Sequence, residues 1–230
     1  MIGWLIIGTS KYFELSLECI DSIQSNYSGN HEQMFYLFTD HDFIPENSNV
    51  DVIKIQHEPF PFISMSRYAH FEENYEKLAT CDYLYYIDAD MKVVDLDDDI
   101  LGDRVVTLHP GFWKHPSREC SFDRNPKSNA YVPYDYDGPY FQNCFQGGTS
   151  REFLSMSELL SERIDEDLLN GVMPLWHDES HMNKYMSDNT PTKILNPGYA
   201  YPKHLENNFD LTGFDVKILS LDKNHDEIRN

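Results

Sequence analysis

The chain has 230 residues and a mass of 27.0 kDa; 40% of the residues are hydrophobic and 14% aromatic, which describes a globular protein and excludes general disorder. Its 39 acidic and 18 basic residues give a formal net charge of -21 at pH 7, which disfavours nucleic acid and anionic membrane surfaces as partners. A small anion can still bind where a metal ion or a few placed cations reverse the local field.

Strands and helices are predicted to alternate in the first part of the chain. Apolar runs that end in polar turns predict strands, and apolar residues at helical spacing, such as Leu15, Cys19 and Ile23, predict helices. This alternation favours an α/β fold with a parallel sheet. The predicted elements are strands at 3–8, 35–40, 50–55 and 82–88 and helices at 12–25 and 63–81.

The later part of the chain changes character. Residues 108–148 are rich in Pro, Gly, Tyr and Asn, which favours a binding region over a passive connection. Helical patterns return at 150–163 and 178–186. No linker or repeat divides the chain, so we expect a single domain over residues 1–230.

The cysteines and the apolar runs bear on the cellular compartment. Four cysteines lie far apart without a CxxC pair, which favours reduced thiols. No apolar run is long enough to span a membrane or to act as a signal, so we expect a soluble, cytoplasmic protein.

Asp88 and Asp90 form a D-x-D sequence directly after the apolar run YLYYI. Ligands of open α/β sheets bind beyond the carboxyl ends of the strands, and two carboxylates there can hold a hard divalent cation that still accepts substrate phosphates. Chance is the alternative, because acidic residues are abundant. The nearby DLDDDI at 95–100 is interpreted as a solvated turn.

The segment PLWHDESHMNKY places Trp176, Asp178 and Glu179 together. It lacks the order of a zinc-protease HExxH motif. A carboxylate pair beside an aromatic ring suits sugar chemistry, since Trp packs on a pyranose and carboxylates bind hydroxyls or stabilise an oxocarbenium-like centre. The alternative is an ordinary acidic first turn of a helix, favoured by the helix dipole. The spacing leaves both interpretations open.

The polar C-terminus concentrates basic residues in an otherwise acidic chain. Lys223, His225 and Arg229 lie within its last eight residues. An ordinary frayed terminus is the simpler interpretation. A tail folded over the site would instead use these cations to clamp a diphosphate and exclude water.

Taken together, these motifs resemble glycosyltransferase family 6, the family of the blood-group A and B transferases and the α1,3-galactosyltransferase. The matching motifs run in the family's order from about residue 5 to the C-terminus: SKY, FYLFTD, SMSR, YYIDAD, LHPGF, AYVP, GGT, WHDESHMNKY, PTKIL, NPGY and KNHDEIRN. The resemblance implies a GT-A type fold, a Rossmann-like mixed sheet with the DxD at a strand end. It also implies a nucleotide-binding half over about 1–107 and an acceptor-binding and catalytic half over about 108–230.

The resemblance implies specific roles for residues of this chain. Asp88 and Asp90 would bind Mn²⁺, with Mg²⁺ as a possible substitute, and Glu179 would be the nucleophile or cation stabiliser. The implied donor-binding residues are Tyr12, Arg67, Asp88, Asp90, Asn143, Cys144, Asp178, Lys223 and Arg229. The implied acceptor-binding residues are His109, Gln142 and Trp176.

The chain departs from the family at two places. The donor-selecting tripeptide is Gln142, Asn143 and Cys144, where mammalian members carry smaller or apolar residues. The choice between UDP-galactose and UDP-N-acetylgalactosamine therefore stays open. Cys144 slightly favours galactose, because a side chain larger than Gly leaves less room for an N-acetyl group. Tyr201 and Pro202 replace a Trp-Asp pair, which removes one acceptor carboxylate. Many bacterial relatives carry Asn-x-Asn and work without metal, whereas this chain keeps both carboxylates, so we expect metal dependence.

The expected function is that of a retaining, Mn-dependent α1,3-glycosyltransferase. It would move galactose or N-acetylgalactosamine from a UDP-sugar to the 3-OH of a galactose-terminated oligosaccharide. The absence of the mammalian anchor and stem favours a soluble enzyme of a bacterium or phage-infected host. Two rival hypotheses remain: a UDP-sugar hydrolase and a non-catalytic sugar-binding module on the same fold.

Overall fold

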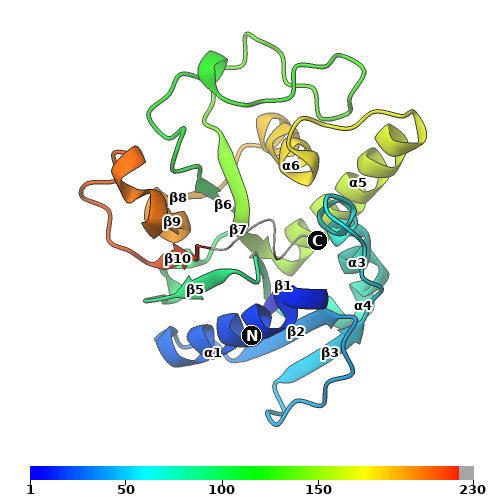
Figure 1. Cartoon of the computed structure of the whole chain (residues 1–230), viewed down its shortest axis with the longest axis vertical. Coiled ribbons are helices and arrows are strands. Elements are labelled where there is room, and N and C mark those ends of the chain that lie inside the picture. The colour runs from blue at the N-terminus through cyan, green and yellow to red at the C-terminus, as the bar shows by residue number, and fades with distance from the viewer. Residues whose placement is uncertain (223–230) are drawn as a thin grey trace.

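A computed structural model describes residues 1–222 and shows a seven-stranded sheet in the order β3-β2-β1-β4-β7-β6-β8 (Figure 1). A second sheet has three strands in the order β5-β10-β9. The strands of the large sheet are β1 (Ile2–Ile7), β2 (Gln33–Thr39), β3 (Val50–Lys54), β4 (Tyr83–Ile87), β6 (Arg104–Leu108), β7 (Phe141–Thr149) and β8 (Lys193–Leu195). Those of the small sheet are β5 (Met91–Val93), β9 (Tyr201–Pro202) and β10 (Ile218–Ser220).

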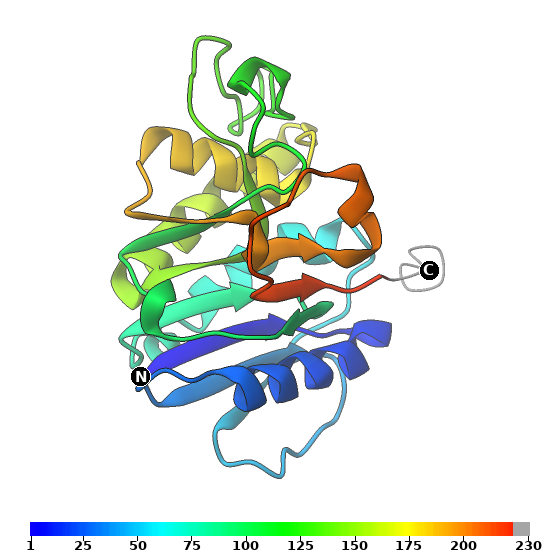
Figure 2. The same ribbon diagram turned by 90° about the vertical axis from the view of Figure 1, so that its left-hand side faces the viewer.

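The α-helices cover both faces of the large sheet. Figure 1 shows α1 on one side and α3, α4 and α5 on the other, and Figure 2 shows the strands edge to edge between them. The α-helices are α1 (Phe13–Asn26), α2 (Phe62–Met65), α3 (Arg67–Glu73), α4 (Tyr75–Leu78), α5 (Ser150–Leu169) and α6 (His177–Asp188). Residues 1–222 also form short 3-10 helices: η1 (Ser10–Tyr12), η2 (Asp98–Ile100), η3 (Ser117–Glu119), η4 (Pro197–Ala200) and η5 (Lys203–Asn208).

Alternation of side chains along the strands builds two hydrophobic cores. Trp4 and Ile6 of β1 pack in the core on the α1 side, whereas Leu5 between them packs in the core on the side of α3, α5 and α6. Successive side chains of a strand point to opposite faces, so an uninterrupted apolar run is what a strand covered on both faces requires. The predicted strands at the N-terminus are therefore confirmed.

The sheet is mixed, which corrects the parallel sheet favoured by the alternation of elements. β1 pairs in parallel with β2 and β4, but β7 is antiparallel to both β4 and β6. Gly147 and Gly148 make this pairing possible: a Cβ at Gly147 would lie 2.5 Å from the carbonyl oxygen of Leu84, and one at Gly148 would lie 2.0 Å from that of Asp103. β7 begins within residues 108–148, the stretch predicted to be a binding region, and ends one residue beyond it.

The predicted helix over residues 63–81 is three short helices. α2 ends before Ser66, and α3 ends before Asn74. The side-chain amide of Asn74 donates to the carbonyl of His70 at 2.9 Å, which competes with the backbone hydrogen bonds that would continue the helix. The earlier break, at Ser66, places Arg67 at the start of α3.

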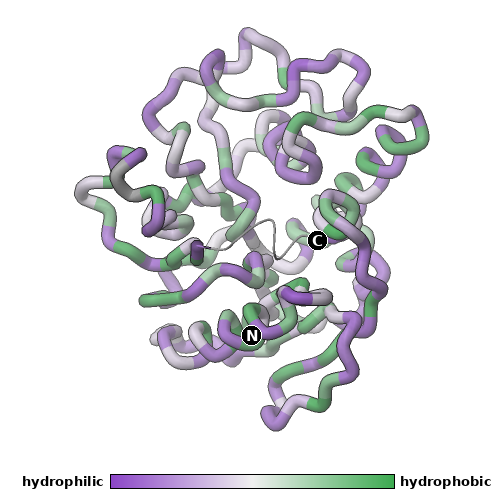
Figure 3. The backbone as a smooth tube through the Cα atoms, in the orientation of Figure 1, coloured by the Kyte–Doolittle hydropathy of each residue, from purple (hydrophilic) through white to green (hydrophobic). Residues whose placement is uncertain are grey.

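The connection between β6 and β7 is anchored to the helices. It forms the upper part of Figure 1 and is coloured mostly purple and white in Figure 3. The Asp167 carboxylate of α5 accepts from the Ser128 hydroxyl at 2.7 Å and from the Asn129 backbone N–H at 2.9 Å. Asp123 in turn accepts from the backbone N–H of Leu175 at 2.9 Å, just before α6. The segment is therefore tied to α5 and to the start of α6.

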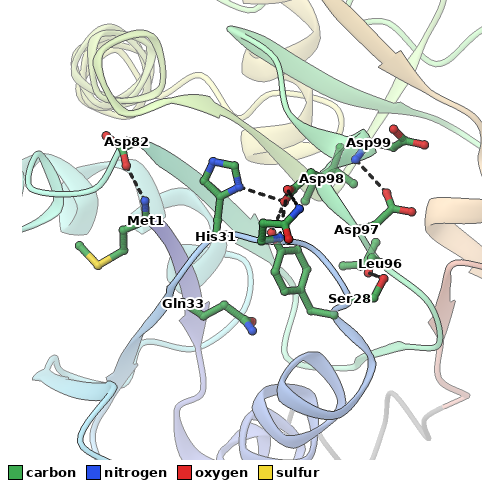
Figure 4. A network of polar contacts seen from close by, with 12 residues as sticks. Met1, Ser28, His31, Gln33, Asp82, Leu96, Asp97, Asp98 and Asp99 are labelled. Atoms are coloured by element: carbon green, nitrogen blue, oxygen red, sulfur yellow. Dashed lines mark hydrogen bonds and ion pairs between the residues drawn. The ribbon is translucent and has the colours of Figure 1, made fainter.

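The acidic segment 95–100 is more ordered than the solvated turn predicted for it. The Asp98 carboxylate accepts from the hydroxyl of Tyr27 and from the backbone N–H of Asn30 at 3.0 Å, and it lies 3.0 Å from the His31 ring (Figure 4). The hydrogen bond from Tyr27 is the main cause that lowers the pKa of Asp98 to about 2. Asp98 therefore joins the segment that follows α1 to the segment between β5 and β6.

Two expectations from composition can be compared with the structure. All four cysteines are free and buried, which confirms that they form no disulfide. Among the helices of residues 1–222, none combines the length and the apolar character needed to cross a membrane.

Candidate active site

The main pocket opens where the strand order changes direction. β1 is followed in sequence by its neighbour β2 on one side, and β4 joins it on the other, so the carboxyl ends of β1 and β4 border a crevice where α/β proteins bind ligands. The pocket is lined by Ile7, Thr9, Tyr12, His57, Phe60, Ile63, Ser64, Arg67, Tyr86, Asp88, Ala89 and Asp90. Four of the predicted site residues thus line one pocket: Tyr12, Arg67, Asp88 and Asp90.

The DxD segment is held by the strands on both sides of it. The backbone N–H of Asp88 donates to the carbonyl of Cys144 in β7 at 2.9 Å, and the Asp88 carboxylate accepts from the Tyr86 hydroxyl. The carbonyl of Asp90 accepts from the backbone N–H of Leu221 at 3.0 Å. Asp90 is 7% exposed and lines the pocket.

Arg67 links the DxD to the carboxylates of α6. Its guanidinium lies 3.6 Å from Asp88 Oδ1 through Nη2 and 3.0 Å from Asp178 Oδ2 through Nε. It also lies over the ring of Tyr86, 4.2 Å from the ring centre. Burial alone lowers the pKa of Arg67, but the carboxylates of Asp178 and Asp88 raise it, so the guanidinium stays charged.

Asp178 and Glu179 lie in the first turn of α6, which confirms that they form an acidic first helical turn. Their side chains also converge on β7. Asp178 Oδ2 accepts from Asn143 Nδ2 at 2.6 Å, and Glu179 Oε2 accepts from the backbone N–H of Asn143 at 3.1 Å. The two interpretations of this motif are compatible, because the helix dipole favours carboxylates at the same end that contacts Arg67 and β7.

Glu179 is held at both oxygens. Its Oε1 accepts from the Tyr140 hydroxyl at 2.7 Å, while the Asn143 N–H binds Oε2. The side chain of Asn183, one turn further along α6, binds the backbone N–H and C=O of Phe141 at 2.9 and 2.8 Å. These contacts fix the start of α6 against β7 and give Glu179 one orientation.

Burial dominates the ionisation of both carboxyl groups. It raises the pKa of Glu179 to about 7, although the hydrogen bonds from Tyr140 and Asn143 act in the opposite direction. It raises the pKa of Asp178 to about 6 against the lowering effect of Arg67. Burial, with the adjacent Glu179 carboxylate, also raises the pKa of Tyr140, so its hydroxyl remains a hydrogen-bond donor.

The residues predicted to bind an acceptor lie around this carboxylate pair, outside the lining of the main pocket. The His109 ring lies 5.7 Å from the Tyr140 ring, and burial lowers the pKa of His109 to about 4, which leaves it neutral. Trp176 immediately precedes α6 and is 50% exposed. Gln142 lies in β7, and its buried Oε1 has no hydrogen-bond partner among the described residues.

Cys144 is buried beside the DxD, and its carbonyl binds Asp88, as described above. Lys223, His225 and Arg229 lie outside the described residues, so the clamp predicted for them stays a prediction.

The donor set fits a divalent cation that is shared with a substrate. Asp88 and Asp90 supply carboxylate oxygens, the ligands that Mn²⁺ and Mg²⁺ prefer, to one wall of the pocket. Within residues 1–222, no three His, Cys, Asp or Glu side chains are grouped to hold a metal ion by themselves. Such a set leaves coordination positions for phosphate oxygens.

Several contacts of the site escaped the sequence analysis. Tyr140 lies 39 positions before Glu179 in a stretch with many tyrosines, so no signal marked it as the partner of that carboxylate. His57 lines the pocket beside Thr9, with 3.0 Å between His57 Nδ1 and Thr9 Oγ1. Tyr68 and Gln146 support Asn143 from beneath the pocket. Their positions follow from how the chain folds and not from a motif.

Comparisons with known proteins agree with this geometry. The family model described as Glycosyltransferase family 6 matches residues 1–230. The chain is 30% identical over 240 residues to the histo-blood group ABO system transferase 2 of Rattus norvegicus, covering 100% of this chain and 71% of that protein.

Two further relatives extend the match. The globoside alpha-1,3-N-acetylgalactosaminyltransferase 1 of Gallus gallus is 26% identical over 241 residues, with coverage of 100% and 69%. The O-antigen biosynthesis glycosyltransferase WbnI of Escherichia coli is 27% identical over 234 residues, with coverage of 96% and 94%. The chain therefore belongs to glycosyltransferase family 6, and its mixed α/β sheet is the GT-A type fold of that family.

Proposed function

We propose that this protein is a retaining α1,3-glycosyltransferase that moves galactose or N-acetylgalactosamine from a UDP-sugar to the 3-OH of a galactoside acceptor. The family and the activities for which its relatives are named support this class of reaction. We further propose that residues 1–230 act as one catalytic domain in the cytoplasm. The donor half would be about 1–107, and the acceptor and catalytic half about 108–230.

The observation that carries the proposal is the double contact of Arg67. One guanidinium lies 3.6 Å from the DxD carboxylate Asp88 and 3.0 Å from Asp178, although the two acids are 90 positions apart. A nucleotide-sugar needs positive charge near its anionic diphosphate and hydrogen-bond acceptors, such as carboxylates, near the hydroxyls of its sugar. Arg67 therefore joins a site for the diphosphate to a site for the sugar.

The donor would bind across the pocket. Tyr12 lines the pocket beyond β1, where it would contact the uridine, and Asp178 would accept hydroxyls of the hexose. Cys144 lies under the DxD on β7 and would limit the space beside the sugar. Lys223 and Arg229 would close over the diphosphate. Asn143 belongs to the same wall of the site.

A divalent cation would be held by Asp88 and Asp90, with Mn²⁺ as the first choice and Mg²⁺ as a substitute. When bound, it would neutralise charge on the departing diphosphate. Arg67 contributes a fixed positive charge to the same region, because it is buried and paired with carboxylates on both sides.

Glu179 would act at the anomeric carbon. The bond from this carbon to the diphosphate oxygen breaks, and UDP leaves with the electron pair. The acceptor 3-OH oxygen bonds to the same carbon, and its proton is transferred to the released UDP. Ionised Glu179 stabilises positive charge on the sugar or attacks it, and Tyr140 and the Asn143 N–H hold it in place. His109, Gln142 and Trp176 would orient the acceptor.

A donor screen tests the proposal directly. UDP-galactose, UDP-N-acetylgalactosamine and UDP-glucose are each incubated with lactose or fucosylated lactose and Mn²⁺, and the products are identified by mass spectrometry and by the anomeric coupling in NMR. We expect an α1,3-linked product from one or both of the first two donors. Formation of a β-linked product, or transfer only from UDP-glucose, would contradict the proposal.

The same screen separates the rival functions. Release of free sugar from a donor without elongation of any acceptor would identify a hydrolase. Metal-dependent UDP binding with neither transfer nor hydrolysis would identify a sugar-binding module. Glu179→Gln is the matched control, since it should retain UDP binding and lose transfer.

A further inference from the structure

A chain of neutral polar side chains lies beneath the carboxylates of the site. Tyr68 of α3 and Gln146 of β7 are each 0% exposed, and Asn143 of β7 is 5% exposed. The Tyr68 hydroxyl donates to Asn143 Oδ1 at 3.2 Å, and Gln146 Nε2 donates to the same oxygen and to the Tyr68 hydroxyl oxygen at 2.8 Å. The chain ends at Asp178, where Asn143 Nδ2 donates to Oδ2 at 2.6 Å.

The direction of these hydrogen bonds follows from the charge at their end. Asp178 Oδ2 also lies 3.0 Å from Arg67 Nε in an ion pair, so it is the negatively charged partner. Asn143 must therefore present its NH₂ group to Asp178, because its oxygen in that place would repel the carboxylate. The oxygen of Asn143 then faces Gln146 and Tyr68, both of which can donate. Each donor in the chain thus points toward Asp178.

Gln146 is the first residue of this hydrogen-bonded series, and its own side chain is only partly hydrogen-bonded. Its Oε1 is buried and has no hydrogen-bond partner among the described residues. A buried acceptor without a partner destabilises a fold, and an apolar side chain at this position would avoid the cost. Stability therefore does not explain the amide at this position. Its NH₂ group donates to Asn143 Oδ1, and this contact is the better explanation.

The backbone of Asn143 reaches the remaining charged groups of the site. Its N–H donates to Glu179 Oε2 at 3.1 Å, and its C=O accepts from Arg67 Nη1 at 3.3 Å. One residue thus contacts Arg67, Asp178 and Glu179, while both polar atoms of its side chain are already bonded to protein groups. The Oδ1 of Asn143 already accepts two hydrogen bonds, one Nδ2–H is used on Asp178, and the residue is 5% exposed, so only its second side-chain N–H could still meet a sugar.

We propose that Asn143, oriented by Gln146 and Tyr68, is a positioning residue that holds Asp178 and Glu179 in place and does not itself contact the donor sugar. This inference rests on the proposed glycosyltransfer and refines the donor-binding role implied for Asn143 by its place in the tripeptide. Discrimination between donors would then fall to the neighbours Gln142 and Cys144. Asn143 would affect the rate with every donor alike.

The first test is Asn143→Ala, measured with UDP-galactose and UDP-N-acetylgalactosamine as the two donors. We expect kcat to fall by about tenfold or more, by the same factor with both donors, because a hydrogen bond to a charged group is lost. The KM for the donor should change by less than about threefold. A changed ratio between the two donors with kcat retained would show that Asn143 contacts the sugar and would overturn the proposal.

Gln146→Leu provides an independent test that should not impair folding, since it removes the unpartnered oxygen. We expect an unchanged or higher Tm together with a kcat reduced about fivefold to tenfold at constant donor KM. A purely structural role would instead lower Tm and kcat together. A normal kcat, or parallel losses of Tm and kcat, would overturn the proposal.

The matched control is Gln33→Leu, which removes a half-buried side-chain amide from the start of β2, at the opposite end of the strands from the site; Gln33 Oε1 accepts from Trp4 Nε1 at 3.2 Å. Its kcat should equal that of the wild type. Failure of the wild type to transfer from any UDP-sugar would contradict the proposed function itself. Variants that match an active wild type would contradict only the role of Asn143 and Gln146.

Discussion

Glu179→Gln is expected to stabilise the folded protein at alkaline pH while it abolishes turnover. The Glu179 carboxyl has a pKa of about 7 in the folded protein, against an ordinary value of 4.5. The stability that this group contributes is therefore full below pH 4.5 and is lost as the pH rises through 7. Above pH 7 the buried carboxylate lowers the free energy of unfolding, and a neutral Gln does not.

The pKa difference sets an upper bound of about 3 kcal/mol on this effect, and the partial exposure of Glu179 reduces it to about 1–3 kcal/mol. For a chain of this length, that corresponds to a rise in Tm of roughly 3–10 °C at pH 8.5. Gln also fits the contacts. Its oxygen can accept from the Asn143 N–H, and its NH₂ can donate to the Tyr140 oxygen once the hydroxyl rotates.

The assay is thermal unfolding of wild type and variant at pH 5.5 and 8.5, without divalent ions or UDP. The lower pH stays above the sequence pI of about 4.6, where the protein has little net charge. The Tm difference should favour Gln and should grow with pH. A difference that is equal at both pH values, or a variant less stable at pH 8.5, would refute the reasoning. Glu152→Gln is the control, since Glu152 binds Arg104 at 2.7 Å and its loss should lower Tm slightly or not at all.

Three further predictions concern activity. Glu179→Gln should lower kcat by about three orders of magnitude while calorimetry still detects UDP binding; near-normal turnover would remove Glu179 from the mechanism. Tyr140→Phe should lower kcat about tenfold and move the acid limb of the kcat profile to higher pH, because the lost hydrogen bond favours ionised Glu179; an unmoved limb would contradict that role. EDTA should abolish transfer, and Asp88→Asn or Asp90→Asn should remove the Mn²⁺ dependence of UDP affinity measured by calorimetry; full activity with EDTA would exclude a metal requirement.

The sequence predicts best those strands that are uninterrupted apolar runs. β1 and β4 are apolar runs because both faces of the sheet are covered, and the DxD follows β4 where such sheets bind ligands. β7 lies between β4 and β6 inside the same sheet but carries Gln142, Asn143, Gln146 and two glycines. These polar residues are typical of a loop, and only their hydrogen bonds to Asp178 and Tyr68 explain why they lie in a buried strand.

The contacts within the site are harder to predict than the residues. The motifs identify Asp88, Asp178 and Glu179 one by one, yet the bridge through Arg67 and the hydrogen bond from Tyr140 join residues that lie 21 to 111 positions apart. Nothing local in the sequence encodes such distances. They arise because β4, β7 and α6 pack side by side, which depends on glycines that allow close strand pairing.

The charge balance of the site bears on the order of binding. Asp88 and Asp178 contact the Arg67 guanidinium, and Asp90 and Glu179 lie nearby, so within the described residues this region of the protein is net negative unless some carboxyl groups are protonated. A diphosphate adds further negative charge and would be repelled from such a site. A divalent cation on the DxD reverses the local field and also favours ionisation of the neighbouring carboxyl groups. We therefore expect a cation to bind before the donor, because it would offset the repulsion of the diphosphate and would favour the ionised Glu179 that the proposed chemistry requires.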